Sequence, residues 1–249
     1  MKIRLLSAFF SKIKHRTPTV ILWICVSVLL LRGIQLQIAD VCCVPSDSME
    51  DTIFAGDCLL VHKTRSIARN DIIIFNHPNG SGTQLIKRCV GLPGDTVTLH
   101  EGQVYTNGEI VVVPPTIKIP FTAYSVNFPH QSLGWTTNNY GPVIVPFRGM
   151  TINLDSINIE LYRNIIQFEG HEISRRDSVI YIDGHGVAAY TFDTNSYFVL
   201  GDNRGNSFDS RYWGFVAQEL IVGKAILVYF SKDAGLKQIR WNRLFKKIR

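Results

Sequence analysis

The amino-acid sequence predicts a mainly β protein preceded by one N-terminal transmembrane helix. Short runs rich in valine, isoleucine and aromatic residues recur between turn residues, which is typical of strands. Two-residue hairpin signals, Asn107-Gly108 and Asp183-Gly184, follow such runs. An apolar segment behind a basic N-terminus predicts the helix. The predicted strands are CLLVHK, DIIIFN, LIKRCVGL, DTVTLH, SVIYID, SYFVLG and LIVGKAILVYF.

The predicted transmembrane anchor occupies residues 17–39. Val20 to Leu31 is apolar except for Ser27, and it follows residues 1–16, which carry five basic side chains and no acidic one. About 20 helical residues cross a hydrocarbon core of about 30 Å, and the basic flank predicts a cytoplasmic N-terminus with the rest of the chain exported. A cleavable signal peptide is the alternative. No small-x-small cleavage site directly follows the apolar run, so a retained anchor is favoured.

The positive charge of the chain is confined to its two ends. The formal net charge is +6, but residues 17–231 carry 14 basic and 19 acidic side chains. This distribution argues against a basic nucleic-acid groove and favours ends that lie near an anionic membrane. Residues 232–249 carry seven basic side chains with Trp241 and Phe245 among them. This tail is either an interfacial helix or a terminal helix docked on the domain.

One helix is predicted at Ile157–Phe168, where apolar residues fall on one face and Gly170 follows as a cap. The segment from Pro114 to Met150 is irregular and rich in proline, asparagine and aromatic residues, which suggests an insertion or a surface excursion.

The five cysteines and seven histidines show no metal-ligand spacing. We therefore predict no metal and no cofactor. The cysteine pattern also does not indicate a disulfide framework, and Cys58 and Cys89 are expected to be small buried apolar residues. Nothing in the sequence fixes an oligomeric state.

Three blocks carry candidate chemistry. They are PSDSM beginning at Pro45, LIKRCVGLPGD beginning at Leu85, and GDNRGNSFDSRYWGFV beginning at Gly201. Lys87 lies within an apolar strand-like run, where desolvation lowers the pKa of an amine. A neutral amine beside the Ser48 hydroxyl can take its proton, as a serine nucleophile requires when no histidine serves as base.

Together, in this order and behind an apolar span, these blocks resemble the bacterial type I signal peptidases (leader peptidases), a family of membrane-anchored proteases with a Ser/Lys dyad. The resemblance extends from the span through Phe230. It implies a coiled antiparallel β-sheet catalytic domain with an inserted α/β subdomain. The catalytic domain is expected at 40–113 and 195–231, and the inserted subdomain at 114–194.

The resemblance also implies an activity: removal of signal peptides from exported preproteins by cleavage after a small-x-small motif. Ser48 would be the nucleophile and Lys87 the general base. Ser46 would donate its hydroxyl to the oxyanion, together with the backbone N–H of Ser48. The expected partners are preproteins and the lipid bilayer of the bacterial inner (cell) membrane, with the catalytic domain on the exported side and with no nucleic acid.

Four further residues take supporting roles by the same resemblance. Ser207 would orient the lysine amine, and Asp209 and Arg211 would form an ion pair beneath the site. Met49 would help to line a substrate pocket. Two residues depart from the usual pattern. Asp51 stands where the family usually has proline, and Asn70 stands where it usually has glycine; we expect neither change to abolish activity.

Three alternatives remain. A self-cleaving Ser/Lys protease related to stress-response repressors would be soluble, which the apolar span contradicts. A protease dedicated to pilin or conjugation-protein maturation shares the same signals. A membrane-tethered β-domain that binds peptides or partner proteins without cleaving them would be expected to have a defective dyad, whereas Ser48 and Lys87 are both present.

Overall fold

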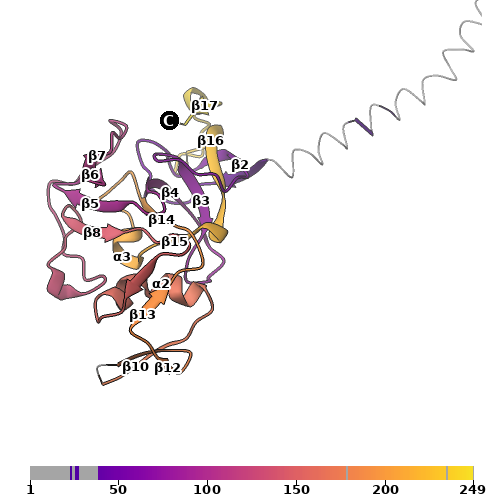
Figure 1. Cartoon of the computed structure of the whole chain (residues 1–249). Coiled ribbons are helices and arrows are strands. Elements are labelled where there is room, and N and C mark those ends of the chain that lie inside the picture. The colour runs from indigo at the N-terminus through magenta and orange to yellow at the C-terminus, as the bar shows by residue number, and fades with distance from the viewer. Residues whose placement is uncertain (1–22, 24–25, 28–38, 178, 234, 249) are drawn as a thin grey trace, which may run out of the picture. The chain divides into compact units, whose positions relative to one another are not determined.

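The computed structural model describes residues 23, 26–27, 39–177, 179–233 and 235–248. Residues 41–249 form one compact unit and residues 1–40 form another, and Figure 1 draws the undescribed residues in grey. The predicted anchor at 17–39 lies almost wholly outside the described residues. No helix among the residues that are described is both long and apolar enough to cross a membrane.

The centre of the larger unit is an eight-stranded sheet in the order β1-β2-β16-β3-β4-β14-β15, with β17 paired to β16. Its registers, where described, are antiparallel. The strands are β1 (Ala39–Cys43), β2 (Asp57–His62), β3 (Ile72–Asn76), β4 (Gln84–Gly91), β14 (Ser196–Leu200), β15 (Val216–Ala217), β16 (Ile221–Ser231) and β17 (Lys246–Lys247). Register shifts along β16 occur against both of its main partners, and such bulges bend a strand and increase its twist.

A second antiparallel sheet has the order β7-β6-β5-β8. Its strands are β5 (Thr96–His100), β6 (Gln103–Thr106), β7 (Glu109–Ile110) and β8 (Tyr140–Ile144). Asn107 and Gly108 connect β6 to β7 with φ angles of 54° and 84°, as a tight two-residue hairpin turn requires. Because β8 pairs with β5, the predicted domain boundary at residue 114 falls inside this single sheet.

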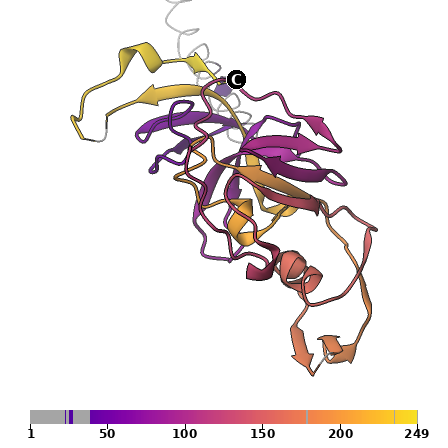
Figure 2. The ribbon, with the colours of Figure 1, turned by 90° about the vertical axis from the view of Figure 1, so that its left-hand side faces the viewer.

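Of the next elements, η1 precedes β8 and the others lie between β8 and β14. They are η1 (Gln131–Leu133), β9 (Thr151–Asn153), α2 (Asn158–Phe168), β10 (Ile173–Arg176), β11 (Val179–Ile182), β12 (His185–Gly186) and β13 (Ala189–Thr191). Figures 1 and 2 show β10 and β12 at the end of the unit farthest from β17. The predicted helix is confirmed, and the Gly170 N–H bonds to the Gln167 carbonyl just beyond its end.

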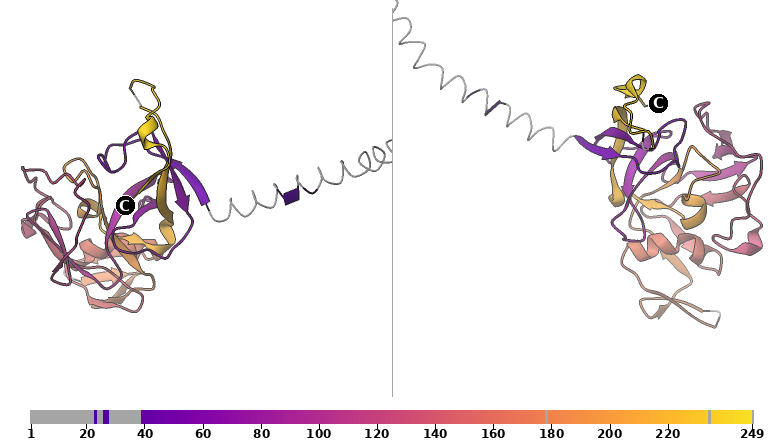
Figure 3. Two further views of the ribbon diagram at one scale, coloured as in Figure 1. Left: turned by 90° about the horizontal axis from the view of Figure 1, so that it is seen from above. Right: turned by 180° about the vertical axis from the view of Figure 1, so that it is seen from behind.

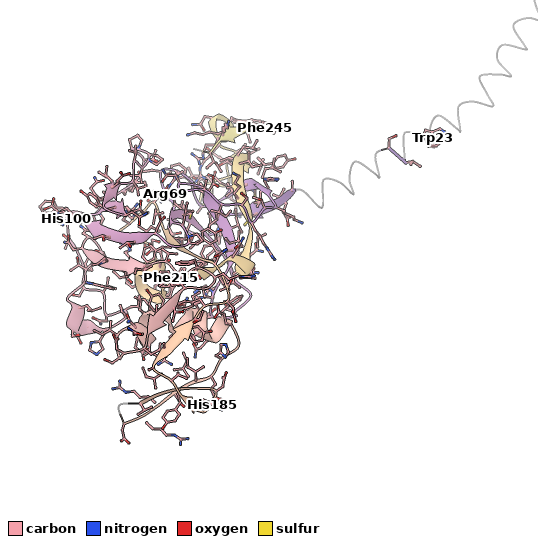
Figure 4. The ribbon with its side chains drawn as sticks, viewed as in Figure 1. Trp23, Arg69, His100, His185, Phe215 and Phe245 are labelled. Atoms are coloured by element: carbon pink, nitrogen blue, oxygen red, sulfur yellow. A yellow bond between two sulfur atoms is a disulfide. The ribbon has the colours of Figure 1, made fainter. Side chains whose placement is uncertain are left out.

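The seven predicted strands are all present, with boundaries shifted by at most a few residues. Their buried side chains form three apolar clusters. The largest joins the second sheet, α2 and β14 around residues such as Phe198 and Phe215, and Phe215 lies near the middle of the unit in Figure 4. The second cluster surrounds Met49 and Leu59. The third lies between β3, β4 and β14.

The sequence prediction for Cys58 was wrong. Cys58 is bonded to Cys43 in a disulfide that joins β1 to β2. Spacing alone could not reveal this pair, because the two cysteines meet only through strand pairing. Cys89 is fully buried with a free thiol, as predicted.

Both helical predictions for the C-terminal tail were wrong as well. Its described part contains a short 3-10 turn, η3 (Trp241–Arg243), and the strand β17. The tail nevertheless docks on the domain, because the Arg243 guanidinium donates to the buried Asp57 carboxylate. Figure 3 shows this yellow segment beside the indigo strands, and the hydrogen bond from Arg240 to the Ala55 carbonyl confirms the contact.

Candidate active site

The structure brings Ser48 and Lys87 together. The Lys87 Nζ lies 2.6 Å from the Ser48 Oγ, which is a short hydrogen bond. Ser48 comes from the turn after β1, and Lys87 comes from β4, where it pairs with Ile73 of β3. A contact across 39 residues of sequence therefore depends on the order of strands in the main sheet.

Burial sets the proton affinity of this lysine. Lys87 is only 3% exposed. Desolvation lowers the pKa of Lys87 to about 8, the charge of Asp209 opposes that shift, and the charge of Arg211 adds to it. The charge of Asp202 also opposes the shift. Desolvation is the largest cause, so the apolar surroundings decide the direction of the shift. An amine with this pKa is available as a base at mildly alkaline pH.

The loop that carries Ser48 is anchored to the GDNRGN segment. The Ser48 carbonyl accepts a hydrogen bond from the Asn203 N–H at 3.1 Å. The Asp202 N–H donates to the Met49 sulfur at 3.4 Å, and the Thr52 hydroxyl donates to the Asp202 carboxylate at 2.7 Å. Within the described part of the chain, the Ser48 N–H donates to no other group, so it can serve a ligand.

Met49 does not have the location that the sequence predicted. It is 1% exposed and belongs to the second core cluster instead of lining the cleft. The reason is the compact turn after Ser48, in which the Ile53 N–H bonds to the Met49 carbonyl. That turn directs the methionine into the domain and leaves the serine at the surface of the cleft.

The backbone at Asp51 has a conformation that proline could not adopt. Its φ angle is +74°, a left-handed conformation that the proline ring forbids because it fixes φ near −65°. The side chain lies 3.1 Å from the Lys118 amine, which also contacts Glu50. Asn70 has a φ of 72°, which asparagine tolerates better than most residues. Both departures from the family pattern therefore fit the local backbone.

Ser207 lies beside the dyad but does not make the predicted bond. It lines the same cleft as Ser48 and Lys87. Its buried hydroxyl makes no hydrogen bond of normal geometry with a described residue, but it lies close enough to Asp209 to help lower the pKa of that carboxyl. Gly201 makes its position possible. A Cβ on Gly201 would lie 2.2 Å from the Ser207 Oγ and 2.6 Å from the Ser48 carbonyl oxygen, closer than van der Waals contact permits.

The predicted ion pair between Asp209 and Arg211 is formed. Both side chains are fully buried, and the guanidinium donates through Nε and Nη2 to the two carboxylate oxygens at 2.8 Å. Burial raises the pKa of Asp209, but the charge and hydrogen bonds of Arg211 outweigh burial, so this pKa lies below its usual value. Asp209 also accepts the Gly201 N–H and caps the short helix α3 (Ser210–Trp213). The pair thereby fixes the segment that carries Ser207.

A second buried ion pair was missed by the sequence reasoning. The Arg88 guanidinium donates to both oxygens of Asp202 at 2.8 and 2.6 Å, and both side chains are fully buried. The available signal was the position of Arg88 in an apolar strand, because a buried arginine requires an anion. The sequence offered no means to choose Asp202, which lies 114 positions away. This pair ties β4 to the loop that holds Ser48.

Ser46 is exposed, and its hydroxyl lies 3.4 Å from the Ser48 Oγ. The dyad opens into a cleft of about 470 Å³. At its rim, the exposed Phe208 ring stacks on Tyr212 at 5.3 Å. The cleft is lined by Ser46, Asp47, Ser48, His77, Leu85, Lys87, Gly205, Asn206, Ser207, Phe208 and Tyr212. Among the described residues, no three His, Cys, Asp or Glu side chains are grouped so as to hold a metal ion.

Comparison with known proteins agrees with this geometry. Residues 17–230 match the family model described as signal peptidase, peptidase S26. Signal peptidase I of Buchnera aphidicola subsp. Acyrthosiphon pisum is 31% identical over 234 residues, which cover 81% of this chain and 72% of the relative. Signal peptidase I of Aquifex aeolicus is 28% identical over 225 residues, covering 82% and 80%.

Among solved structures, a signal peptidase I from Enterococcus faecalis matches with 23% identity and a TM-score of 0.31, covering 64% of this chain and 96% of that one. The family match covers most of the sequence, and it includes the blocks that supply the Ser48–Lys87 contact and the buried ion pairs. This chain belongs to the signal peptidase family, peptidase S26, and is a peptidase.

Proposed function

We propose that the chain is a membrane-bound serine endopeptidase that removes signal peptides from exported preproteins, with Ser48 as nucleophile and Lys87 as general base. The observation that carries the proposal is the 2.6 Å contact between the amine and the hydroxyl, in surroundings that lower the lysine pKa to about 8. A neutral amine at this distance can accept the serine proton. The relatives named signal peptidase I support the substrate class.

The reaction would proceed through an acyl-enzyme. The Ser48 Oγ bonds to the scissile carbonyl carbon while its proton passes to the Lys87 Nζ. The new oxyanion accepts hydrogen bonds from the Ser48 N–H and the Ser46 hydroxyl, and one such donor contributes about 3–4 kcal/mol to transition-state stabilisation. The carbon–nitrogen bond then breaks, and Lys87 protonates the departing amine. Water, deprotonated by Lys87, then bonds to the acyl carbon. The bond to the Ser48 Oγ breaks, and Lys87 returns the proton to that oxygen, which restores the free enzyme.

Ser207 would orient the lysine during this cycle. Its hydroxyl is buried beside the dyad and makes no hydrogen bond of normal geometry with a described residue, so a side-chain rotation toward the Lys87 amine would give it one. Hydrogen bonds of a catalytic site are often loose before substrate binds. The Asp209–Arg211 pair would hold the Ser207 segment in place during that rotation.

The substrate would bind in the cleft as an extended strand. Main-chain pairing supplies affinity in this mode, and shallow pockets for alternate side chains supply selectivity. Ser46, Leu85 and Phe208 line the cleft around the dyad, and small residues at the first and third positions before the cut would fit beside them.

The bilayer would hold the enzyme close to its substrates. The apolar run Val20–Leu31 behind five basic side chains supports a single-pass anchor with a cytoplasmic N-terminus. At the other end of the chain, Trp241 and Phe245 are 73% and 67% exposed among basic side chains, and Figure 4 shows Phe245 at the margin of the unit. Exposed aromatic and basic residues together favour contact with lipid headgroups.

A defined preprotein tests the proposal. Detergent-solubilised protein should cut it after a small-x-small motif, as read by mass spectrometry of both products, and Ser48→Ala and Lys87→Ala should abolish cleavage. Ser81→Ala is a matched control because Ser81 lies in an exposed loop. Near-wild-type turnover by either dyad variant would refute the assignment. Cleavage of pilin-type precursors alone would indicate a dedicated maturation protease, and binding without products would indicate a peptide-binding domain.

A further inference from the structure

The disulfide encloses the proposed nucleophile. We call residues 44–57, which run from the end of β1 to the first residue of β2, the nucleophile loop. Cys43 and Cys58 stand immediately before and after this loop and are bonded to each other. At the same place, the Val44 N–H bonds to the Asp57 carbonyl and the Gly56 N–H bonds to the Val44 carbonyl, each at 2.8 Å. The two ends of the loop are therefore held together covalently as well as by hydrogen bonds.

The second half of the nucleophile loop is held by the protein core. Met49 and Ile53 are 1% and 0% exposed, and Thr52 bonds to Asp202. These contacts fix the chain after Ser48. They do not fix the chain before it.

The first half of the loop has much less support. Pro45, Ser46 and Asp47 are all exposed. A 3.2 Å hydrogen bond from the Asn203 side-chain amide to the Asp47 carbonyl connects this segment to another part of the domain. This segment carries the Ser46 hydroxyl and leads directly to Ser48. Its position therefore depends on its anchor at Cys43 and Val44.

Val44 itself is 4% exposed and belongs to the second core cluster, but the strand that leads to it is weak. Among the described strands, β1 stands at one end of the sheet, next to β2, and its side chains are exposed or half-buried. A strand with one neighbour and little buried surface opens at low free-energy cost. The covalent link to Cys58 prevents such opening, because Cys58 lies in β2, which also pairs with β16.

We propose that the Cys43–Cys58 bridge is a positioning device for the nucleophile loop: it holds Ser46 and Ser48 against Lys87, and its reduction lowers turnover in a domain that stays folded. The role in turnover rests on the proposed function. Reduction by a dithiol transfers two electrons and two protons, breaks the sulfur–sulfur bond and leaves two thiols, while the dithiol becomes a disulfide. The three core clusters contain neither sulfur, so the sheet keeps its apolar packing.

Steady-state kinetics of the full chain in detergent, before and after treatment with dithiothreitol, test the proposal. We expect kcat on a small-x-small peptide to fall at least about tenfold, since misplacing reacting groups by about 1 Å can cost about a hundredfold. KM should change less than kcat, because the cleft walls formed by β4 and the Ser207 segment do not move and only the part lined by residues 46–48 shifts. Reoxidation should restore kcat. An unchanged kcat after verified reduction would overturn the proposal, and so would loss of the near-ultraviolet circular dichroism of the folded domain.

Matched variants distinguish the effect of reducing the Cys43–Cys58 bridge from any effect of the other cysteines. Cys43→Ser combined with Cys58→Ser should show the low kcat of the reduced protein and should not respond to dithiothreitol. Cys42→Ser alters the neighbouring cysteine, which is not in a disulfide, and should behave as wild type in both states. A double variant with wild-type kcat, or a Cys42→Ser protein that has lost its response to the reductant, would contradict the assignment.

Hydrogen–deuterium exchange measures the opening of the nucleophile loop independently of catalysis. Reduction should speed exchange of the Val44 and Gly56 amides, which bond across the base of the loop, while the amides of β14 keep their protection. If the oxidised protein cleaves no preprotein, the proposed function fails, and this exchange difference still decides whether the bridge holds the loop. Equal exchange in the two redox states would refute the positioning role itself.

Discussion

The pH dependence of cleavage gives a quantitative test of the lysine base. Burial lowers the pKa of Lys87 to about 8, so about a tenth of the amine is neutral at pH 7, half at pH 8 and about nine-tenths at pH 9. Proton transfer from Ser48 requires the neutral amine. The value of kcat/KM should therefore rise about tenfold per pH unit below pH 8 and level off above about pH 9.

The same shift makes the lysine costly for folding at neutral pH. A folded-state pKa of about 8 against 10.5 for an ordinary lysine corresponds to about 3 kcal/mol. Below about pH 8 the amine is protonated in both the folded and the unfolded chain, so the folded state carries this full cost. The cost fades as pH rises from about 8 toward 10.5. Lys87→Met should therefore be inactive yet more stable than wild type at pH 7, with the difference shrinking toward pH 10.

The assay is the initial rate on a fluorogenic peptide without titratable side chains, from pH 6 to pH 10 in constant detergent and ionic strength. Urea unfolding of wild type and Lys87→Met over the same range measures stability. A flat rate profile, or a midpoint near the ordinary lysine value, would show that Lys87 is not a desolvated base. A Lys87→Met protein less stable than wild type at pH 7 would show that burial is not the dominant cause of the shift.

Three further substitutions test the surroundings of the dyad. Asp202→Ala leaves the Arg88 guanidinium buried without its anion and should destabilise the domain by about 3–5 kcal/mol in urea unfolding; a loss below 1 kcal/mol would contradict this. Gly201→Ala places a Cβ 2.2 Å from the Ser207 Oγ and should lower kcat at least about tenfold, or about 1.4 kcal/mol. Asp51→Pro cannot adopt φ of +74° and should cost about 1–3 kcal/mol of stability, whereas Asp51→Gly should be tolerated.

The strands could be predicted from sequence because each depends on a local pattern. The central residues of DIIIFN and SYFVLG are apolar, and the structure buries both faces of β3 and β14 except at Asn76. The turn at Asn107-Gly108 is equally local, since both residues must adopt positive φ. The helix after Ile157 has its apolar face encoded within eleven residues.

Contacts between distant segments could not be predicted in the same way. Cys43 and Cys58 meet because β1 pairs beside β2, and ADVCC has no alternating pattern that marks it as a strand. Arg243 reaches Asp57 over 186 positions, and its basic, partly apolar surroundings resemble a helix as much as an extended tail. The prediction that Met49 lines the substrate pocket was wrong, because the sequence Ser48-Met49 does not reveal which of the two side chains faces the cleft and which faces the core.

The neighbours Lys87 and Arg88 show how one strand supplies both the proposed base and its support. Side chains alternate along a strand, so the guanidinium points to Asp202 and gains a bidentate anion, while the amine points into the cleft and meets the Ser48 hydroxyl. Asp209, the acid with the largest effect on the amine, is itself paired with Arg211, whose charge acts on Lys87 in the opposite direction. The arginine has its own counterion and binds the nucleophile loop through Asp202. A lysine without one loses its proton near pH 8, and this difference in pairing gives the two adjacent bases their different roles.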